Sequence, residues 1–287
     1  MAQILEKQVI VEEAKESNRK IEAKSITFGY DDVTILNSID LEVKEGEFLV
    51  LMGPSGCGKS TFLRLMAGLD EPKSGEIIID GKTLTNQQPD CGVVFQDYSL
   101  FPWLTAEDNI VLALKQKVKN TKSKKELRHI ASEYLGLVQL GQAVKKYPGQ
   151  MSGGMKQRAA IARALSFGSD LLLMDEPFGA LDPVTRVHLQ NLLLQISRDQ
   201  QRTIVFVTHD ADEAIYLADR IIMFSLGAEG AITTSVDVPF KKPRNRKLLF
   251  ESKEFMRFRD YILTVMNRGL LDNLEEGNEI RSYGEGI

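Results

Sequence analysis

The sequence predicts an α/β fold in which a mostly helical segment is inserted between two groups of strands. From Ile21 onward, short apolar and β-branched runs alternate with glycine, which is typical of strands joined by tight turns. After Pro102 the pattern becomes helical until about Phe167. Two further apolar strands, LLLMDEP and TIVFVTH, then enclose an amphipathic helix. A strand, a helix and a strand in this order indicate a βαβ unit with parallel strands.

The individual elements follow from local patterns. Strands are expected in IEAKSITFGY, ILNSIDLEVKEG, FLVLMG, EIIIDGK and CGVVFQ. The stretch TAEDNIVLALKQKV is expected to be a helix that Thr105 caps, because a hydroxyl precedes acidic residues and an apolar stripe. The basic stretch KQKVKNTKSKKELRH is expected to be a solvated face, with contact to lipid headgroups or a partner as the alternative.

These elements suggest three regions. Residues 1–20 form an N-terminal extension, residues 21–235 the main domain with a helical insert at about 105–167, and residues 236–287 a linker and a C-terminal helix. The last region begins with the Pro-marked VPFKKPRNRK and continues into one expected helix, ESKEFMRFRDYILTVMNRG.

Composition excludes several classes of protein. The 287 residues are 43% hydrophobic and 26% charged, which is typical of a globular protein with a sizeable core. The formal net charge of −4 does not suggest a general nucleic-acid binder. Two cysteines are too few for a disulfide framework, and the first residues lack a secretory signal, so a reduced, cytoplasmic compartment is expected. Apolar runs are shorter than the roughly 18 residues that span a bilayer, so any membrane role is expected to be peripheral.

Residues 53–60, GPSGCGKS, fit the phosphate-loop pattern G-x-x-x-x-G-K-[ST] between an apolar strand and a helix-like segment. Glycines allow backbone N–H groups to surround phosphate oxygens, and the helix N-terminus favours the anion. Lys59 is expected to reach the β- and γ-phosphates of a nucleotide and Ser60 to hold Mg²⁺. The residues predicted to bind ATP here are Gly53, Pro54, Ser55, Gly56, Cys57, Gly58, Lys59, Ser60 and Thr61.

Cys57 allows two interpretations. It is either a small residue that the loop tolerates, or a thiol with a lowered pKa near a helix N-terminus, whose alkylation blocks nucleotide binding.

The strand LLLMDEP ends in two acids, and strand ends are where an α/β sheet places ligand-binding groups. With a phosphate loop upstream, Asp175 is expected to hold Mg²⁺ through water. Glu176 is expected to orient or deprotonate the attacking water.

A second anion site is predicted at Ser152, Gly153 and Gly154, which precede the helix-like KQRAAIARAL. Adjacent glycines are costly in a helical segment and therefore need a reason. Because one phosphate chain hardly needs two such sites from one subunit, two copies of the chain are expected to meet, each offering Ser152–Gly154 to the nucleotide of the other.

SGG before a helix, combined with GPSGCGKS and LLLMDEP, resembles the ATP-binding cassette (ABC) family over roughly Ile21 to Gly227. The resemblance implies a P-loop NTPase (RecA-like) core, an antiparallel β subdomain and an inserted helical subdomain. It also implies Tyr30 as the residue that stacks on adenine, Gln96 as a contact to the metal and the attacking water, and His209 as the contact to the γ-phosphate. Asp182 is implied to cross the dimer interface.

The resemblance thus implies Glu176, His209 and Gln96 as catalytic residues, and Mg²⁺ held by Ser60, Gln96 and Asp175. The sequence departs from the family pattern at Met151 and Met155, which flank SGG, and altered affinity at most is expected. His129 and His188 have no comparable context and are expected to be exposed or structural.

The loop QDYSLFPWLTAEDNI and the short C-terminal region are similar to the nitrate, sulfonate, taurine and bicarbonate importer branch. That resemblance implies a paired ATPase at the cytoplasmic face of the cell membrane, as a homodimer or with a similar subunit. Two transmembrane permeases and an extracytoplasmic solute-binding protein would complete the complex. An importer of another solute class and a soluble ABC ATPase are the alternatives. The solute itself is not encoded in this subunit.

Trp103, Phe101 and Tyr98 are expected to receive a permease helix, since aromatic anchors suit a docking pocket. The alternative is that they pack the helical insert against the core.

Overall fold

The computed structural model describes residues 19–85, 89–118, 122–227 and 230–266. Most of the expected N-terminal extension and the last part of the C-terminal region lie outside them. The described chain forms two compact units, one made of the residues up to Pro89 and from His209 onward, the other of Asp90–Thr208.

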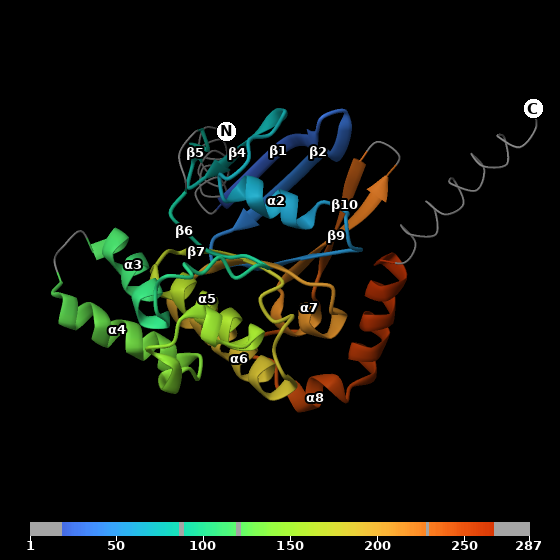
Figure 1. Ribbon diagram of the computed structural model, residues 1–287. Coiled ribbons are helices and arrows are strands. Elements are labelled where there is room, and N and C mark those ends of the chain that lie inside the picture. Colours follow the sequence, from blue (N-terminus) through green and yellow to red (C-terminus); the bar gives the residue numbers. More distant parts are fainter. Residues whose placement is uncertain (1–18, 86–88, 119–121, 228–229, 267–287) are drawn as a thin grey trace, which may run out of the picture. The chain divides into compact units, whose positions relative to one another are not determined.

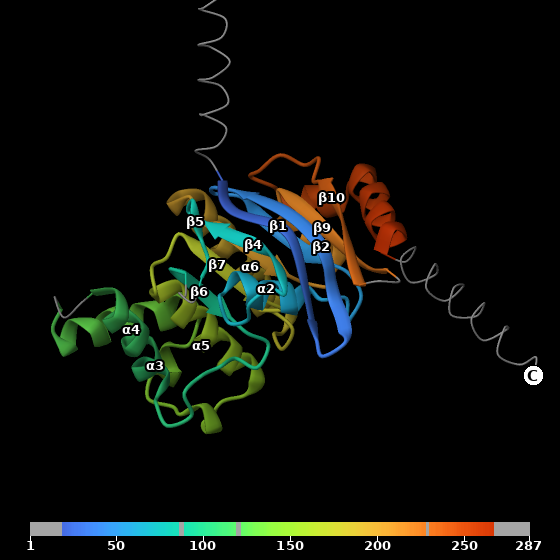
Figure 2. The same ribbon diagram turned by 90° about the horizontal axis from the view of Figure 1, so that it is seen from above.

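The first unit contains a mixed sheet in the order β5-β4-β1-β2-β10-β9-β3. β1 (Arg19–Tyr30) pairs antiparallel with β2 (Val33–Lys44) and with β4 (Ser74–Ile79), which pairs antiparallel with β5 (Lys82–Thr83). Figures 1 and 2 show β1, β2 and β4 side by side. From Ile39 to Lys44, buried apolar residues of β2 alternate with exposed polar ones, so one face of this antiparallel sheet meets the core.

β2 pairs in parallel with β10 at the far end of this group, and β3 (Phe48–Met52) has five residues that are all buried. β3 pairs in parallel with β9 (Arg220–Gly227), and β9 pairs antiparallel with β10 (Gly230–Asp237). No strands are predicted from the sequence in residues 220–237. Their signal is present, however, in the β-branched and apolar residues of RIIMF and ITTSV.

Helices of the first unit pack through aromatic residues. α2 (Lys59–Met66) places Phe62 5.8 Å from the ring centroid of Phe224 on β9. α7 (Ala211–Leu217) packs against β3. The sequence predicts one C-terminal helix, whereas the structure has α8 (Arg246–Phe250) and a separate helical stretch at 253–266. The rings of Phe250 and Phe255 join these two helices at 4.6 Å.

The second unit contains three parallel strands in the order β8-β7-β6, namely Thr203–Val207, Leu171–Asp175 and Cys91–Val94. All residues of β7 and β8 are buried, as expected of parallel strands that are covered on both faces. α6 (Pro183–Gln200) connects β7 to β8, which gives the predicted βαβ unit.

Between β6 and β7 the chain is helical, with α3 (Ala106–Val118), α4 (Lys124–Leu137) and α5 (Gly153–Ser166). Two short 3₁₀ turns, η1 (Gly141–Ala143) and η2 (Pro148–Gln150), lie between α4 and α5. Thr105 caps α3 as expected, because its hydroxyl oxygen accepts from the Asp108 N–H at 3.1 Å.

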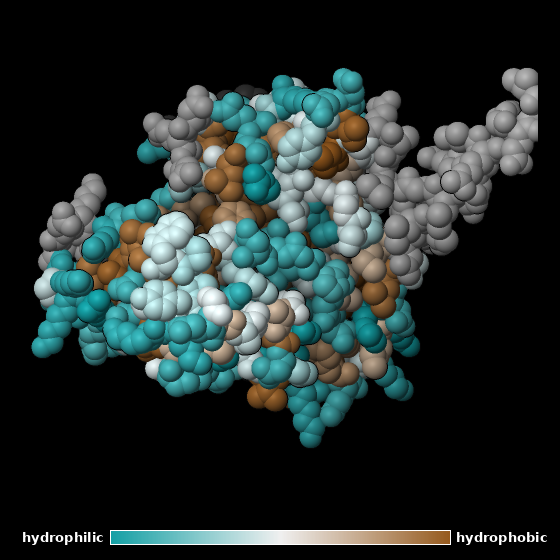
Figure 3. Space-filling model, in the orientation of Figure 1, coloured by the Kyte–Doolittle hydropathy of each residue, from teal (hydrophilic) through white to brown (hydrophobic). Residues whose placement is uncertain are grey.

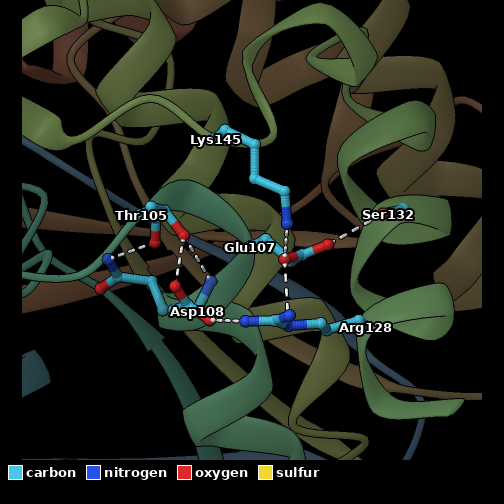
Figure 4. Close-up of polar contacts among 7 residues, drawn as sticks. Thr105, Glu107, Asp108, Arg128, Ser132 and Lys145 are labelled. Carbon is cyan, nitrogen blue, oxygen red and sulfur yellow. Dashed lines mark hydrogen bonds and ion pairs between the residues drawn. The ribbon is translucent and has the colours of Figure 1, made fainter. Parts of the chain in front are cut away.

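A buried carboxylate joins these helices. Glu107 is 4% exposed and lies in the first turn of α3. Its carboxylate receives Arg128 of α4 at 3.4 Å, Lys145 from the segment after η1, and the Ser132 hydroxyl at 3.5 Å. Figure 4 shows Arg128 and Ser132 pointing toward Glu107 from α4, and Lys145 pointing toward it from the segment after η1. The Glu107 cluster, defined as these four residues, therefore fixes α3 to α4 and to the residues that lead into η2.

The surface seen in Figure 3 is mostly hydrophilic, with small separate apolar areas. In the described ranges, no helix combines the length and the apolarity required to cross a bilayer.

Candidate nucleotide-binding and catalytic site

The phosphate loop is built from glycine conformations that other residues rarely adopt. Gly53, Gly56 and Gly58 have φ angles of +151°, +81° and +90°. A Cβ on Gly53 would lie 2.2 Å from the Phe224 carbonyl oxygen, and one on Gly58 would lie 2.7 Å from Leu36. Only glycine fits these two positions, so β2 and β9 hold the loop at the N-terminus of α2. The first turn of α2 carries no acidic side chain that would oppose an anion.

Lys59 is positioned inside this loop. Its side-chain ammonium donates to the carbonyl oxygens of Gly53 at 2.9 Å and Pro54 at 2.6 Å, and the residue is 6% exposed. A positive charge held among loop carbonyls at a helix N-terminus is suited to the oxygens of a phosphate chain.

The environment of Cys57 decides between the two interpretations of this residue, a tolerated small side chain or a reactive thiol. The side chain is fully buried, and burial raises the pKa of its thiol despite the nearby Lys59 ammonium. The reactive-thiol interpretation is therefore wrong, because it needs a lowered pKa and access to reagent.

Tyr30 and His209 belong to the same unit as the phosphate loop. Tyr30 ends β1, is 53% exposed, and its ring lies nearly perpendicular to that of Phe28 at a centroid distance of 5.2 Å. Its partner strand β2 supplies Leu36, which contacts Gly58. His209 is exposed and directly precedes Asp210, which caps α7 by accepting from two backbone N–H groups.

The second unit carries the acidic pair. Asp175 ends β7 and is 6% exposed. Glu176 follows with a φ of +44°, a left-handed conformation that is unfavourable for a residue with a Cβ. Its N–H donates to the Val207 carbonyl at 3.1 Å, which ties the residue to the end of β8. Strained backbone of this kind, held by neighbouring strands, is typical of functional sites.

Gln96 is exposed and follows β6 by two residues. The chain then turns through Tyr98 and Ser99, both with positive φ, and the Asp97 carboxylate accepts from the Ser99 N–H and hydroxyl. Arg163 of α5 donates to the Ser99 carbonyl and so fixes this loop to the helix that SGG begins.

Ser152 is the N-cap of α5, and its hydroxyl accepts from the Met155 N–H at 3.3 Å. The glycines that follow have a packing reason in addition to the predicted bare N–H groups. A Cβ on Gly154 would lie 2.9 Å from the Ala180 carbonyl oxygen, and one on Gly153 would lie 3.2 Å from the Tyr98 hydroxyl. The Tyr98 hydroxyl thus lies beside the first turn of α5.

Asp182 lies at the start of α6 and accepts from the Thr185 N–H at 3.0 Å. Hydrogen bonding from Thr185 lowers the pKa of this carboxyl, so it is ionised at neutral pH. The residue therefore has a capping function beside its predicted place at the dimer interface.

Comparison with known proteins identifies the family. A family model described as ABC transporter matches residues 36–179. The bicarbonate transport ATP-binding protein CmpD of Synechocystis sp. (strain ATCC 27184 / PCC 6803 / Kazusa) is 45% identical over 81% of this chain and 82% of that protein. The nitrate import ATP-binding protein NrtD of Synechococcus elongatus (strain ATCC 33912 / PCC 7942 / FACHB-805) is 44% identical over 81% and 85%. The chain belongs to the ABC transporter family.

Solved structures extend this ABC assignment to the fold. A dimeric, post-hydrolysis ATP-binding cassette, MJ0796 bound to ADP and Pi, matches with a TM-score of 0.70 and 35% identity over 77% of this chain and all of that one. A second dimeric structure of MJ0796, a bacterial ABC transporter cassette, matches with a TM-score of 0.71 and 36% identity. These likenesses confirm the predicted fold class. As an ABC ATPase, the chain binds and hydrolyses ATP.

The two units of this ABC ATPase share the predicted site residues. The first holds the phosphate loop, Tyr30 and His209, and the second holds Gln96, Ser152–Gly154, Asp175, Glu176 and Asp182.

Asn109 is not predicted from the sequence, although it is 1% exposed and shapes the loop before α3. Its side chain accepts from the Phe101 N–H and donates to the Phe101 and Leu104 carbonyls. The only local signal is an amide on the apolar side of a helix.

Proposed function

We propose that this ABC ATPase is the energy-supplying subunit of a bacterial importer for small solutes of the nitrate and bicarbonate kind. The observation that best supports the ATP-binding part of this proposal is the Lys59 ammonium, held by two carbonyls inside a glycine loop at the start of α2. The nitrate and bicarbonate transport proteins that match over most of their length support the importer assignment and the solute class. The chain would act at the cytoplasmic face of the cell membrane.

The residues suit ATP hydrolysis in the following way. Lys59 and the N–H groups of the loop bind the β- and γ-phosphates, while Tyr30 stacks on adenine. The oxygen of a water molecule attacks the γ-phosphorus, and the carboxylate of Glu176 accepts a proton from that water. The bond between the γ-phosphorus and the oxygen that bridges to the β-phosphate breaks at the same time. His209 contacts the γ-phosphate, and Gln96 orients the water.

The donors also suit a magnesium ion. The Ser60 hydroxyl, the Gln96 amide and the buried Asp175 carboxylate are hard oxygen ligands of the type that Mg²⁺ prefers. Mg²⁺ bound there would neutralise charge on the phosphate oxygens.

Two copies of the chain, or this chain and a similar subunit, would enclose two nucleotides, with Ser152, Gly153, Gly154 and Asp182 of each facing the nucleotide of the other. The dimeric MJ0796 cassettes support this arrangement. The γ-phosphate would then favour the closed dimer because both subunits contact it. Partner permeases would follow closure and reopening, and an extracytoplasmic protein would select the solute.

The experiment that tests the proposal is purification of the tagged chain from its native membranes in mild detergent, followed by mass spectrometry. Recovery of a polytopic permease supports the importer. Recovery of a homodimer alone, with no crosslink to a permease through the Gln96–Trp103 loop, contradicts it and favours the soluble ABC ATPase. Ligand screening of a co-purified binding protein tests the solute class.

A further inference from the structure

One buried amide on α5 connects two parts of the candidate site. Gln157 is 2% exposed. Its side-chain Nε2 donates to the Glu176 carbonyl at 2.9 Å, and its Oε1 accepts from the Ala180 N–H at 2.9 Å. Both polar atoms of the amide therefore form hydrogen bonds with the same stretch of backbone, the turn from Glu176 to Ala180.

Gln157 also lies close to SGG. It is four residues after Gly153 and three after Gly154, so it stands one turn further along the same side of α5. Gly154 itself approaches the Ala180 carbonyl so closely that a Cβ would lie 2.9 Å away. The first turn of α5 and the turn after Glu176 are therefore in direct contact at two successive levels of the helix.

The backbone at Glu176 needs such support. Its φ of +44° is a conformation that persists only when the surroundings impose it. The Glu176 carbonyl accepts hydrogen bonds from the Gln157 side chain and, at 3.2 Å, from the Gly179 N–H. The backbone N–H of Glu176 donates to the Val207 carbonyl. Of these partners, Gln157 is the one that comes from the helix of the second anion site.

We propose that Gln157 is a positioning residue that holds Glu176 in its reactive orientation and couples it to Ser152–Gly154 of the same chain. This inference rests on the proposed function, in which the SGG of one subunit contacts the nucleotide of the other. Binding of the partner's nucleotide at the first turn of α5 then orders the residue that hydrolyses this chain's own ATP. The two nucleotide sites of a dimer communicate through one side chain.

The test uses two substitutions of different severity. Gln157→Glu keeps an acceptor for the Ala180 N–H but removes the donor to the Glu176 carbonyl, and Gln157→Leu removes both bonds. We expect kcat for ATP hydrolysis to fall at least about tenfold in each, because small errors in orientation are costly in catalysis. The KM for ATP is expected to change less than about twofold, since neither bond involves the phosphate loop.

A purely structural role is separated by a matched control. Gln190→Leu removes another fully buried amide, on α6 of the same unit. The comparison requires that the Gln157 variants and the control unfold at the same temperature. The proposal is overturned if kcat of the Gln157 variants then falls no further than kcat of the control. It is also overturned if the KM for ATP rises by the same factor by which kcat falls. Wild-type protein that hydrolyses no ATP would instead contradict the ATPase chemistry on which the proposed function depends, so the two failures are distinguishable.

Coupling to SGG is tested by a double-mutant cycle with Ser152→Ala, which removes the cap of α5. If Gln157 transmits the state of the first turn, the double variant loses less kcat than the product of the two single losses. Losses that simply multiply would overturn the coupling.

Discussion

Cys57 and Cys91 both lie in surroundings that oppose ionisation of a thiol. Burial raises the pKa of Cys57, and it raises that of Cys91 to about 12. Because the thiolate is the reactive form, we expect a maleimide to modify the native protein at pH 8 more than tenfold slower than a free cysteine. Mass spectrometry of timed samples measures this, with the protein in guanidinium chloride as the control. Native labelling at the rate of a free thiol would contradict it.

The raised pKa of Cys91 also has a consequence for stability. The unfolded thiol ionises near pH 9 and the folded one near pH 12, so above pH 9 the native state binds more protons than the unfolded state. The free energy of unfolding therefore decreases as pH rises through this range. Urea titrations at pH 8 and pH 10 should show this decrease, and Cys91→Ala should reduce it. An unchanged decrease in the variant would assign it to other groups.

Among the elements, the Glu107 cluster holds the helices between β6 and β7 together. Glu107→Gln replaces a buried carboxylate that receives Arg128 and Lys145, and it removes the charge that both cations meet. We expect a loss of about 1.5–3 kcal/mol of unfolding free energy, because hydrogen bonds to charged groups are worth about this much. Glu133→Gln, on the exposed side of α4, is the control. Equal stability of the two variants would argue against a structural role for the cluster.

Arg244 connects the C-terminal region to α7. Its guanidinium donates to the Ile215 and Tyr216 carbonyls at 3.0 and 2.8 Å and also to the Phe240 carbonyl. Burial lowers the pKa of Arg244 to about 10, so the group stays protonated at neutral pH. Arg244→Met should cost about 2 kcal/mol, since the last carbonyls of α7 lose their donor. Thermal unfolding measures this, and Arg257→Ala at an exposed position should leave the midpoint unchanged.

For the whole molecule, the paired ATPase leads to a prediction about Glu176. Glu176→Gln keeps the size of the side chain but removes the proton acceptor, so ATP should bind without being hydrolysed. We expect a stable dimer in the presence of ATP, measured by light scattering. Lys59→Ala should prevent the dimer, because the phosphates then lose their cation. A Glu176→Gln protein that stays monomeric with ATP would contradict the shared site.

Trp103 tests the link to a permease. It is 69% exposed, and Phe101 lies beside it at a centroid distance of 5.5 Å. The high exposure of Trp103 favours docking over the alternative that it packs the helical insert against the core. Trp103→Ala should weaken co-purification of the permease while ATP hydrolysis by the isolated subunit is retained. Tyr261→Ala removes another exposed ring and is the matched control. Normal assembly and transport by Trp103→Ala would refute the docking role.

Much of the fold could be predicted because its signals are local. The apolar runs of β3, β7 and β8, the Thr105 cap and the strand–helix–strand order are visible in short windows of sequence. β9 and β10 were missed despite their β-branched residues. α8 was missed as well, since it precedes the one C-terminal helix that the sequence predicts from Glu251 onward.

The residues of the candidate site can be predicted from the sequence, because a phosphate loop, a strand that ends in Asp175-Glu176, and SGG before a helix are each made of consecutive residues. The burial of Cys57, the close approach of Gly154 to Ala180 and the hydrogen bonds of Gln157 to the turn after Glu176 follow only from the tertiary structure. The physical reason is the same in each case. Burial, and hydrogen bonds between residues far apart in the sequence, depend on how helices and strands pack. Local sequence patterns do not predict that packing.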